Sequence, residues 1–336
     1  MKWNAIGLVV AVLVFASAAR ADEKPTIDDV KKAWKARQEA NKSFRIEWVE
    51  TVKVKAGAYG TDGYSNPGPH PPEDIELKAV RSFAANGDMA AAAGEQAAYQ
   101  PTKQSFVPFA NSEHFDGTTG VRIMSLSQPG WVRVNIESGE KRISGLNSTS
   151  NEAVTRLYRP LGGGAFAAFE FEGFKLFTGE KIGTVACVEL RKTTNGFRYS
   201  IWCDPEQEFR PVRHSWQDEG GEGRVLDWTY QKGEKERWTP SGWESKRVDK
   251  GGTTTQATKA EVKKLDLAPK FAAEAFAPKA RPGSHVNEYK DGENKGNYLI
   301  RADGSKRLLL AAERSKPFDE IAKTNADGTP YVPAKK

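Results

Sequence analysis

The chain has 336 residues, and its 50 Lys and Arg against 44 Asp and Glu give a formal net charge of +6 at pH 7. The charges are mixed along the chain rather than gathered in a basic stripe, which argues against a nucleic-acid-binding protein. Aromatic residues make up 10% of the sequence and recur in stretches with strand-like alternation. The length allows one large or two ordinary domains, and the composition is typical of a globular, β-rich protein.

The N-terminus has the features of a cleavable secretory signal peptide. Lys2 precedes an apolar run over residues 5–16, and a small-residue stretch then ends at Ala21. The run is well short of the roughly 20 residues that span a bilayer as a helix. We therefore expect cleavage after Ala21 and a periplasmic or secreted product, with no stable membrane insertion after cleavage. Loss of Lys2 and Arg20 leaves 48 basic and 44 acidic residues, a net charge of +4.

A change of hydrophobic period predicts the first elements of the mature chain. Residues 26–29 resemble a capping box, and apolar residues at helical spacing predict a helix to about Ala40. From Phe44 the period becomes two, which predicts a long half-buried strand over residues 43–55. Residues 56–74 are crowded with Gly and Pro and predict a loop. A strand is expected over 76–86, whereas the Ala-rich residues 87–99 leave helix and strand open.

The rest of the chain predicts mostly strands. Short strands are expected near 121–126 and 131–138, then a helix over 152–158 that ends before Pro160. Residues 175–261 form a series of strand-like segments on short loops, which indicates an antiparallel meander. The sequence changes character after Val286. We expect a signal peptide over 1–21, a main domain over 22–286 and a C-terminal extension over 287–336.

Cys187 and Cys203 form a candidate disulfide, because paired cysteines are usual in an oxidising compartment. They flank a predicted hairpin. A two-residue turn at Asn195-Gly196 pairs Val188 with Cys203 and places the two cysteines on opposite faces of the sheet. A three-residue loop instead pairs the cysteines directly, but sets an acidic residue against an apolar one. Both registers stay open.

No motif indicates a catalytic or metal site. The four histidines are widely separated, and none lies in an HExxH pattern or beside a cysteine, so no metal site is expected. The glycines at 162–164 lack the lysine of a phosphate-binding loop, and no GxSxG motif occurs. We expect no cofactor and no enzymatic activity, and a secreted hydrolase is the least favoured function.

A set of inward-pointing aromatic and apolar side chains remains on the predicted sheet. Such residues form a core by default, but a curved sheet with a helix across it can also enclose an apolar ligand. The candidate lining residues of a ligand cavity are Phe44, Ile46, Trp48, Phe83, Phe106, Phe109, Trp131, Phe169 and Trp228.

Several local motifs occur in an order that matches a known family. They are the helix that leads into a strand over residues 30–48, a turn at 115–117, an Asp-Pro turn within 201–206 followed by Pro-Val-Arg at 211–213, and a late segment at 276–286. Over roughly residues 26–286 the chain resembles the periplasmic outer-membrane lipoprotein carriers (LolA-like proteins) and the related lipoprotein-sorting proteins. The Asp-Pro turn with Pro-Val-Arg is the most specific part.

This resemblance implies an α+β, mainly antiparallel β fold. The expected shape is a curved, incomplete β-barrel with an N-terminal helix and one or more helices packed on the concave face, around a cavity that takes acyl chains. The chain is longer than the carriers, through the loop at 56–74, the Ala-rich insert and the tail after 286. No position matches the family's functional residues.

On this basis we expect an exported periplasmic protein that binds a hydrophobic ligand, such as a lipoprotein acyl chain, as a carrier or sensor. An acyl chain in water costs about 0.8 kcal/mol per CH₂, so a soluble carrier must bury it. The alternative is a non-catalytic envelope module that binds another protein on the same scaffold. The expected partners are a lipid or acylated lipoprotein, or an envelope protein, and not a nucleic acid.

Overall fold

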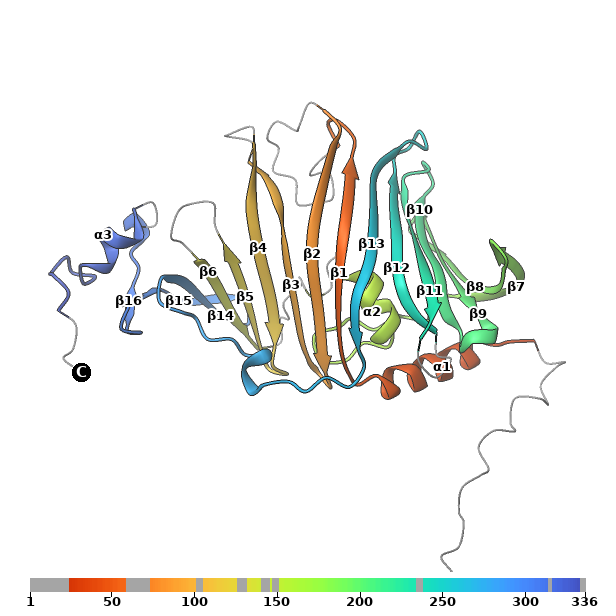
Figure 1. Ribbon diagram of the computed structural model, residues 1–336, viewed down its shortest axis with the longest axis horizontal. Coiled ribbons are helices and arrows are strands. Elements are labelled where there is room, and N and C mark those ends of the chain that lie inside the picture. Colours follow the sequence, from red (N-terminus) through yellow and green to blue (C-terminus); the bar gives the residue numbers. More distant parts are fainter. Residues whose placement is uncertain are drawn as a thin grey trace, which may run out of the picture.

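A single open sheet dominates the computed structural model, which describes residues 24–58, 73–100, 105–125, 132–139, 146, 151–233, 238–313 and 316–332. The sheet has 16 strands and curves without closing into a barrel (Figure 1). The expectation of a mainly antiparallel, curved β fold is confirmed in this form. Among the helices of the described ranges, none has the length and apolar character needed to cross a membrane.

The strands are β1 (Ser43–Val54), β2 (Ile75–Asn86), β3 (Met89–Gln100), β4 (Ser105–Phe115), β5 (Thr119–Ser125), β6 (Val132–Ser138), β7 (Lys175–Ile182), β8 (Val185–Thr194), β9 (Phe197–Asp204), β10 (Arg210–Asp218), β11 (Gly223–Lys232), β12 (Trp238–Val248), β13 (Thr254–Asp266), β14 (Ser284–Lys290), β15 (Glu293–Ile300) and β16 (Lys306–Leu308). The helices are α1 (Ile27–Ala40), α2 (Glu152–Tyr158) and α3 (Phe318–Ala322), with 3-10 turns at Pro205–Gln207 (η2), Ala273–Ala275 (η4) and Ala311–Glu313 (η5).

The strand order places β1 near the centre of the sheet, between β2 and β13. Two antiparallel meanders leave this centre. One runs from β2 to β6 and the other from β13 back to β7. Strand β14 then pairs with β6 in parallel, whereas the other paired strands are antiparallel. The central position of β1 means that strands from both halves of the chain must be present before the sheet is complete.

The first predicted elements are confirmed. Helix α1 begins with a capping box, in which the Thr26 side chain and backbone are both bonded to Asp29, and it buries Val30 and Trp34. Strand β1 follows after two residues. The Ala-rich segment, which the sequence left open, forms strand β3. Hydrogen bonding to β2 and β4 on both sides outweighs the helix propensity of alanine there.

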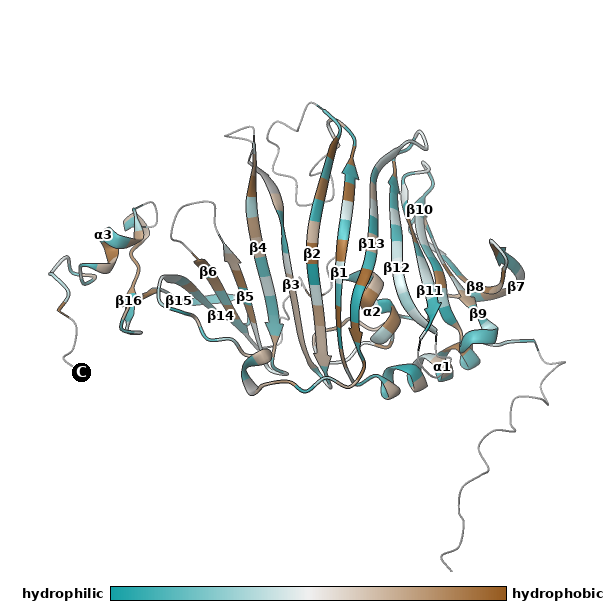
Figure 2. Ribbon diagram, viewed as in Figure 1, coloured by the Kyte–Doolittle hydropathy of each residue, from teal (hydrophilic) through white to brown (hydrophobic). Residues whose placement is uncertain are grey.

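The sheet has an inner and an outer face, which differ in how they are covered. The inner face, defined here by Phe44, Trp48 and Phe83, packs against α2, which lies behind β12 and β13 in Figure 1 and has both hydrophobic and hydrophilic residues in Figure 2. The crossover at residues 267–283 covers part of the outer face. There His114 Nδ1 lies 3.0 Å from the Ala275 carbonyl oxygen, and Ala280 packs on the apolar outer side of β5, β6, β14 and β15.

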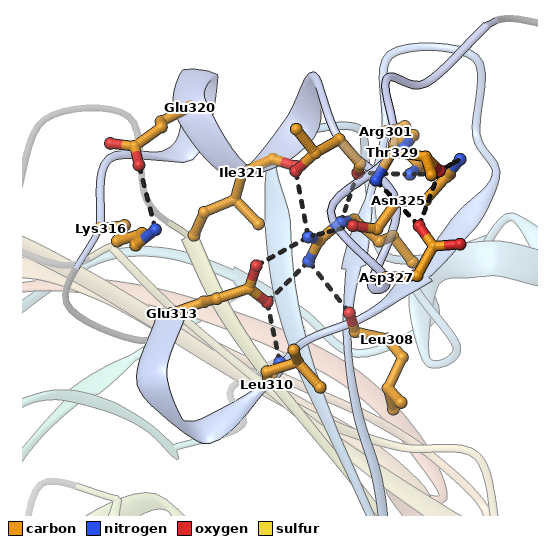
Figure 3. A network of polar contacts seen from close by, with 12 residues as sticks. Arg301, Leu308, Leu310, Glu313, Lys316, Glu320, Ile321, Asn325, Asp327 and Thr329 are labelled. Carbon is orange, nitrogen blue, oxygen red and sulfur yellow. Dashed lines mark hydrogen bonds and ion pairs between the residues drawn. The ribbon is translucent and has the colours of Figure 1, made fainter.

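A network of polar contacts, shown in Figure 3, holds the C-terminal residues to the sheet edge. Arg307 is 3% exposed and forms two hydrogen bonds to Glu313, with further bonds to the backbone carbonyls of Thr324 and Asn325. Beside it, Arg301 donates to the same Thr324 carbonyl. The domain boundary expected after residue 286 falls inside β14, which extends the same sheet, and a division there stays a prediction.

The centre of the core should not tolerate truncation. Phe44 is fully buried, stacks on Phe83 at 5.8 Å between ring centroids, and lies 4.5 Å from the ring of Tyr158. Phe44→Ala should therefore lower the free energy of unfolding by about 3–5 kcal/mol in urea denaturation, because it leaves a cavity between sheet and helix. The control Val80→Ala removes a side chain that is 58% exposed and should change stability by less than about 0.5 kcal/mol. Equal losses for both variants would contradict this description of the core.

Candidate functional site

The structure brings most of the predicted lining residues together, but as a packed core. Five of them, Phe44, Ile46, Trp48, Phe83 and Trp228, lie in one cluster and are at most 5% exposed. Phe169 lies in a second cluster, where its ring is 5.4 Å from that of Trp34 on α1. Phe106 and Phe109 are half-buried on β4, away from both clusters. Trp131 lies outside the described residues.

Helix α2 and the segment that follows it form the inner cover of this core, a name used below for residues 152–166. Trp228 Nε1 donates to the Ala153 carbonyl oxygen at 3.1 Å. The ring of Phe166 lies 5.8 Å from that of Phe83, and the α2 residues Val154 and Leu157 are buried in the same cluster. The inner cover therefore occupies the space above the aromatic surface.

The first residue of α2, the half-buried Glu152, is fixed to the sheet by ionic contacts. Glu152 Oε1 lies 3.1 Å from His214 Nδ1 on β10, and its other oxygen accepts from Arg224 on β11. Arg224 also donates to Ser245 Oγ at 2.8 Å. Burial alone would raise the pKa of Glu152, but the hydrogen bond and charge of His214, together with Arg224 and Arg156, outweigh it and lower the pKa to about 2. Glu152 is therefore a carboxylate that pins α2 to the sheet.

The other end of α2 is fixed by Arg159, which is 4% exposed. Its guanidinium donates to the carbonyl oxygens of Asn41 at 3.2 Å, Lys42 at 2.6 Å and Gly87 at 3.3 Å, and lies 5.5 Å from the Phe44 ring. These carbonyls belong to the α1–β1 connection and the β2–β3 turn. Two charged side chains thus hold the short helix at its two ends, while apolar contacts hold its middle.

A buried polar group borders the aromatic core on β1 to β3. Glu50 is 3% exposed and accepts from Trp48 Nε1 at 2.8 Å and from Arg81 Nε at 2.7 Å. Arg81 also donates to Gln96 Oε1 at 2.6 Å. A side chain at Gly94 would place its Cβ 2.6 Å from Arg81 Nη1, so glycine leaves room for the guanidinium. No sequence motif predicted this group, although Glu50 interrupts the apolar inward positions of β1, diagonally across from an inward arginine on β2.

The Asp-Pro turn, the most specific sequence motif, joins the sheet to α1. Trp34 Nε1 donates to the Phe209 carbonyl oxygen at 2.8 Å, and Arg37 Nη1 donates to the Glu208 carbonyl oxygen at 3.3 Å. Both carbonyls belong to residues with positive φ, 54° at Glu208 and 50° at Phe209. Such angles cost energy in residues other than glycine. The contacts with α1 hold the turn in this shape, so the motif has a structural role here.

The two cysteines are free thiols in the structure. Val188 pairs with Cys203, which is the register of the two-residue Asn195-Gly196 turn and puts Cys187 on the other face. Asn195 and Gly196 both have positive φ, as this hairpin turn requires. Burial raises the pKa of the Cys203 thiol to about 12 and also raises that of Cys187, so neither thiol is reactive at neutral pH. Within the described ranges, no three potential metal ligands converge.

The chain is distantly similar to several solved structures. No protein-family model and no curated relative matches the sequence. A DUF1329 family protein from Desulfovibrio piger ATCC 29098 is 12% identical, with 74% of this chain and 98% of that chain covered and a TM-score of 0.42. A porin-like protein from Bacteroides uniformis ATCC 8492 is 7% identical, with 65% and 97% covered and a TM-score of 0.25. PNGF-II is 8% identical, with 74% and 32% covered and a TM-score of 0.22.

Because Glu152 is a carboxylate in the folded state, the stability of the protein should fall in acid. A pKa lowered from 4.5 to about 2 means that Glu152 stabilises the fold above its unfolded pKa, and that this stabilisation is lost as the pH falls from about 5 towards 2. The loss amounts to about 3 kcal/mol. Urea denaturation of Glu152→Gln should show a deficit of this order at pH 6 that nearly vanishes at pH 2. The control Glu39→Gln, at a side chain that is 53% exposed, should change stability little at either pH, because solvent screens its charge. A deficit independent of pH would contradict the ionic role of Glu152.

Proposed function

We propose that this protein is an exported, non-catalytic envelope protein that binds a hydrophobic chain between the sheet and the inner cover, as a carrier or sensor. The observation that supports this is a difference in size, because the aromatic surface is large and the segment that covers it is small. The surface includes Phe44, Trp48, Phe83, Trp228 and Trp243, contributed by four strands. The cover above it is one helix of seven residues and an irregular segment. A short helix of this size is marginal by itself and depends on its contacts with the sheet.

The energetics allow the inner cover and an acyl chain to exchange. Moving the cover away exposes apolar surface on the sheet and breaks the contacts of Glu152 and Arg159. An acyl chain that takes its place covers the same surface and leaves water itself, which returns about 0.8 kcal/mol for each CH₂. A chain of ordinary lipid length therefore offsets much of the cost of moving a seven-residue helix.

A second function, a module that binds another protein, is favoured by the packing of the same core. Every large side chain of the central cluster is nearly fully buried against its neighbours. If the inner cover never moves, the scaffold presents only its surface to partners. The two functions differ in one physical property, which is whether α2 can leave the sheet.

A covalent lock on α2 tests the first function. Glu152→Cys/His214→Cys, made in a Cys187→Ala/Cys203→Ala background, replaces the pinning contact with two thiols that a short bis-maleimide can join, and no other thiol is left to react. The mature chain from Asp22 should bind a fluorescent long-chain fatty acid with saturable, one-site behaviour. The unlinked variant should bind at least as tightly, because its cover is looser, and linking should weaken binding by more than about tenfold, equivalent to 1.4 kcal/mol.

The lock also provides the matched control, since linked and unlinked protein share one sequence. Equal binding by the two forms would show that the chain does not enter beneath α2. Absence of binding by wild type and both forms would overturn the carrier function and favour the protein-binding module. Circular dichroism of the unlinked variant verifies that it is folded.

A further inference from the structure

One register row on the inner face changes from apolar to polar as it crosses the sheet. The row begins in the aromatic core, where Ile46 on β1 opposes Phe83 on β2 and Phe83 opposes Ala92 on β3. Ala92 opposes the first polar member on β4. The row continues over five neighbouring strands through Glu113, Arg122, Asn135, Asn287 and Asn297. These five residues are called the amide row below, and at about 4.8 Å per strand they span about 19 Å.

The alternation of side chains assigns the amide row to the inner face. Phe115, two residues from Glu113 on β4, packs in the central core. Val121, Val134 and Val286, each one residue from a member of the row, pack in the outer cluster beneath the crossover. The apolar side chains therefore lie on the inner face in the centre of the sheet and on the outer face in the arm formed by β5, β6, β14 and β15. On its inner face this arm carries polar groups.

Several polar groups of the amide row have no partner within the described residues. Glu113 and Arg122 pair at 2.7 Å, and Asn287 Nδ2 donates to Asn135 Oδ1 at 2.8 Å. Asn297 Oδ1 accepts from the neighbouring Asn294. Among the hydrogen bonds of the described part of the chain, none uses Asn135 Nδ2, Asn287 Oδ1 or Asn297 Nδ2. The row thus offers both donors and acceptors, on side chains that are already partly held in place.

The residue types are unusual for a face that only needs to be solvated. Asparagine is depleted in strands, yet three occur in this row and Asn111 lies beside it on β4. These side chains are short and half-buried, in contrast to the exposed lysines along β13. A short amide has few rotatable bonds, so it loses little entropy when it binds a ligand.

The chemistry of the row favours a hydroxyl-rich ligand. An extended peptide pairs with the open edge of a sheet through its main chain, whereas this row lies on a face, where the backbone groups are used within the sheet. Amides that donate and accept at once suit hydroxyl groups, which do the same. We propose that the amide row binds the polyhydroxylated part of a saccharide, either free or as the headgroup of a glycolipid. The row exists with α2 in place, so this site stands apart from the hydrophobic site.

Soluble sugars test the site without any acyl chain. Cellotetraose, maltotetraose and chitotetraose would each be titrated into the mature protein, with binding followed by the side-chain amide NMR signals of asparagine. At least one should bind with Kd below about 1 mM and shift the signals of Asn135 and Asn287. Asn287→Ala and, independently, Asn297→Ala should weaken that binding by roughly tenfold through lost hydrogen bonds. The control Asn86→Ala removes an amide from the opposite face of β2 and should bind as wild type does.

The source of the saccharide is separated by a second titration with an alkyl glycoside below its critical micelle concentration. Binding of the alkyl glycoside that exceeds that of the free sugar, and that the α2 lock reduces to the free-sugar value, would identify a glycolipid headgroup. Equal binding would identify a free saccharide. Failure of all three sugars and the glycoside, or unchanged affinity in both row variants, would overturn the proposal. The sugar titrations use no fatty acid, so the saccharide proposal and the hydrophobic-site proposal are tested independently of each other.

Discussion

The structure depends on how a single-layer sheet covers its own aromatic face. A sheet of this extent buries large side chains only if another layer lies on it. Here the layer over the centre is the inner cover, and it is small for the surface beneath it. Glu152 and Arg159 fix the two ends of its helix, α2, to strands and turns that are far apart in sequence. These contacts, together with the hydrogen bond from Trp228 to Ala153, oppose any movement of α2 away from the aromatic surface.

The open sheet also buries its apolar side chains on different faces in its centre and in its arm. Near the centre the apolar side chains point to α2, while in the arm formed by β5, β6, β14 and β15 they point to the crossover at 267–283. That crossover brings β14 beside β6 in parallel, because the chain passes over the outer face before it re-enters the sheet. Among the described residues, no apolar cluster packs on the inner side of the arm, which carries amides and an ion pair instead.

Much of the local structure follows from the sequence, because it rests on period and turn chemistry. The capping box at Thr26, the alternation from Phe44 and the Asn195-Gly196 turn each predict an element that the structure contains. The inward direction of Phe44, Trp48 and Phe83 was predictable for the same reason. What these side chains contact was not, since the position of α2 depends on Glu152 meeting His214 from a distant strand. The amide row was equally hidden, because its members on β14 and β15 join the other three only through the parallel β6–β14 pairing.

Hydrogen–deuterium exchange of α2 tests the central idea, that the inner cover moves aside for a hydrophobic chain. With a saturating long-chain fatty acid, the backbone amides of residues 152–158 should exchange faster, because the helix loses its support on the sheet. Exchange in β1, which stays paired with β2 and β13, should be unchanged. Bound fatty acid with α2 amides as protected as before, or more so, would contradict the account.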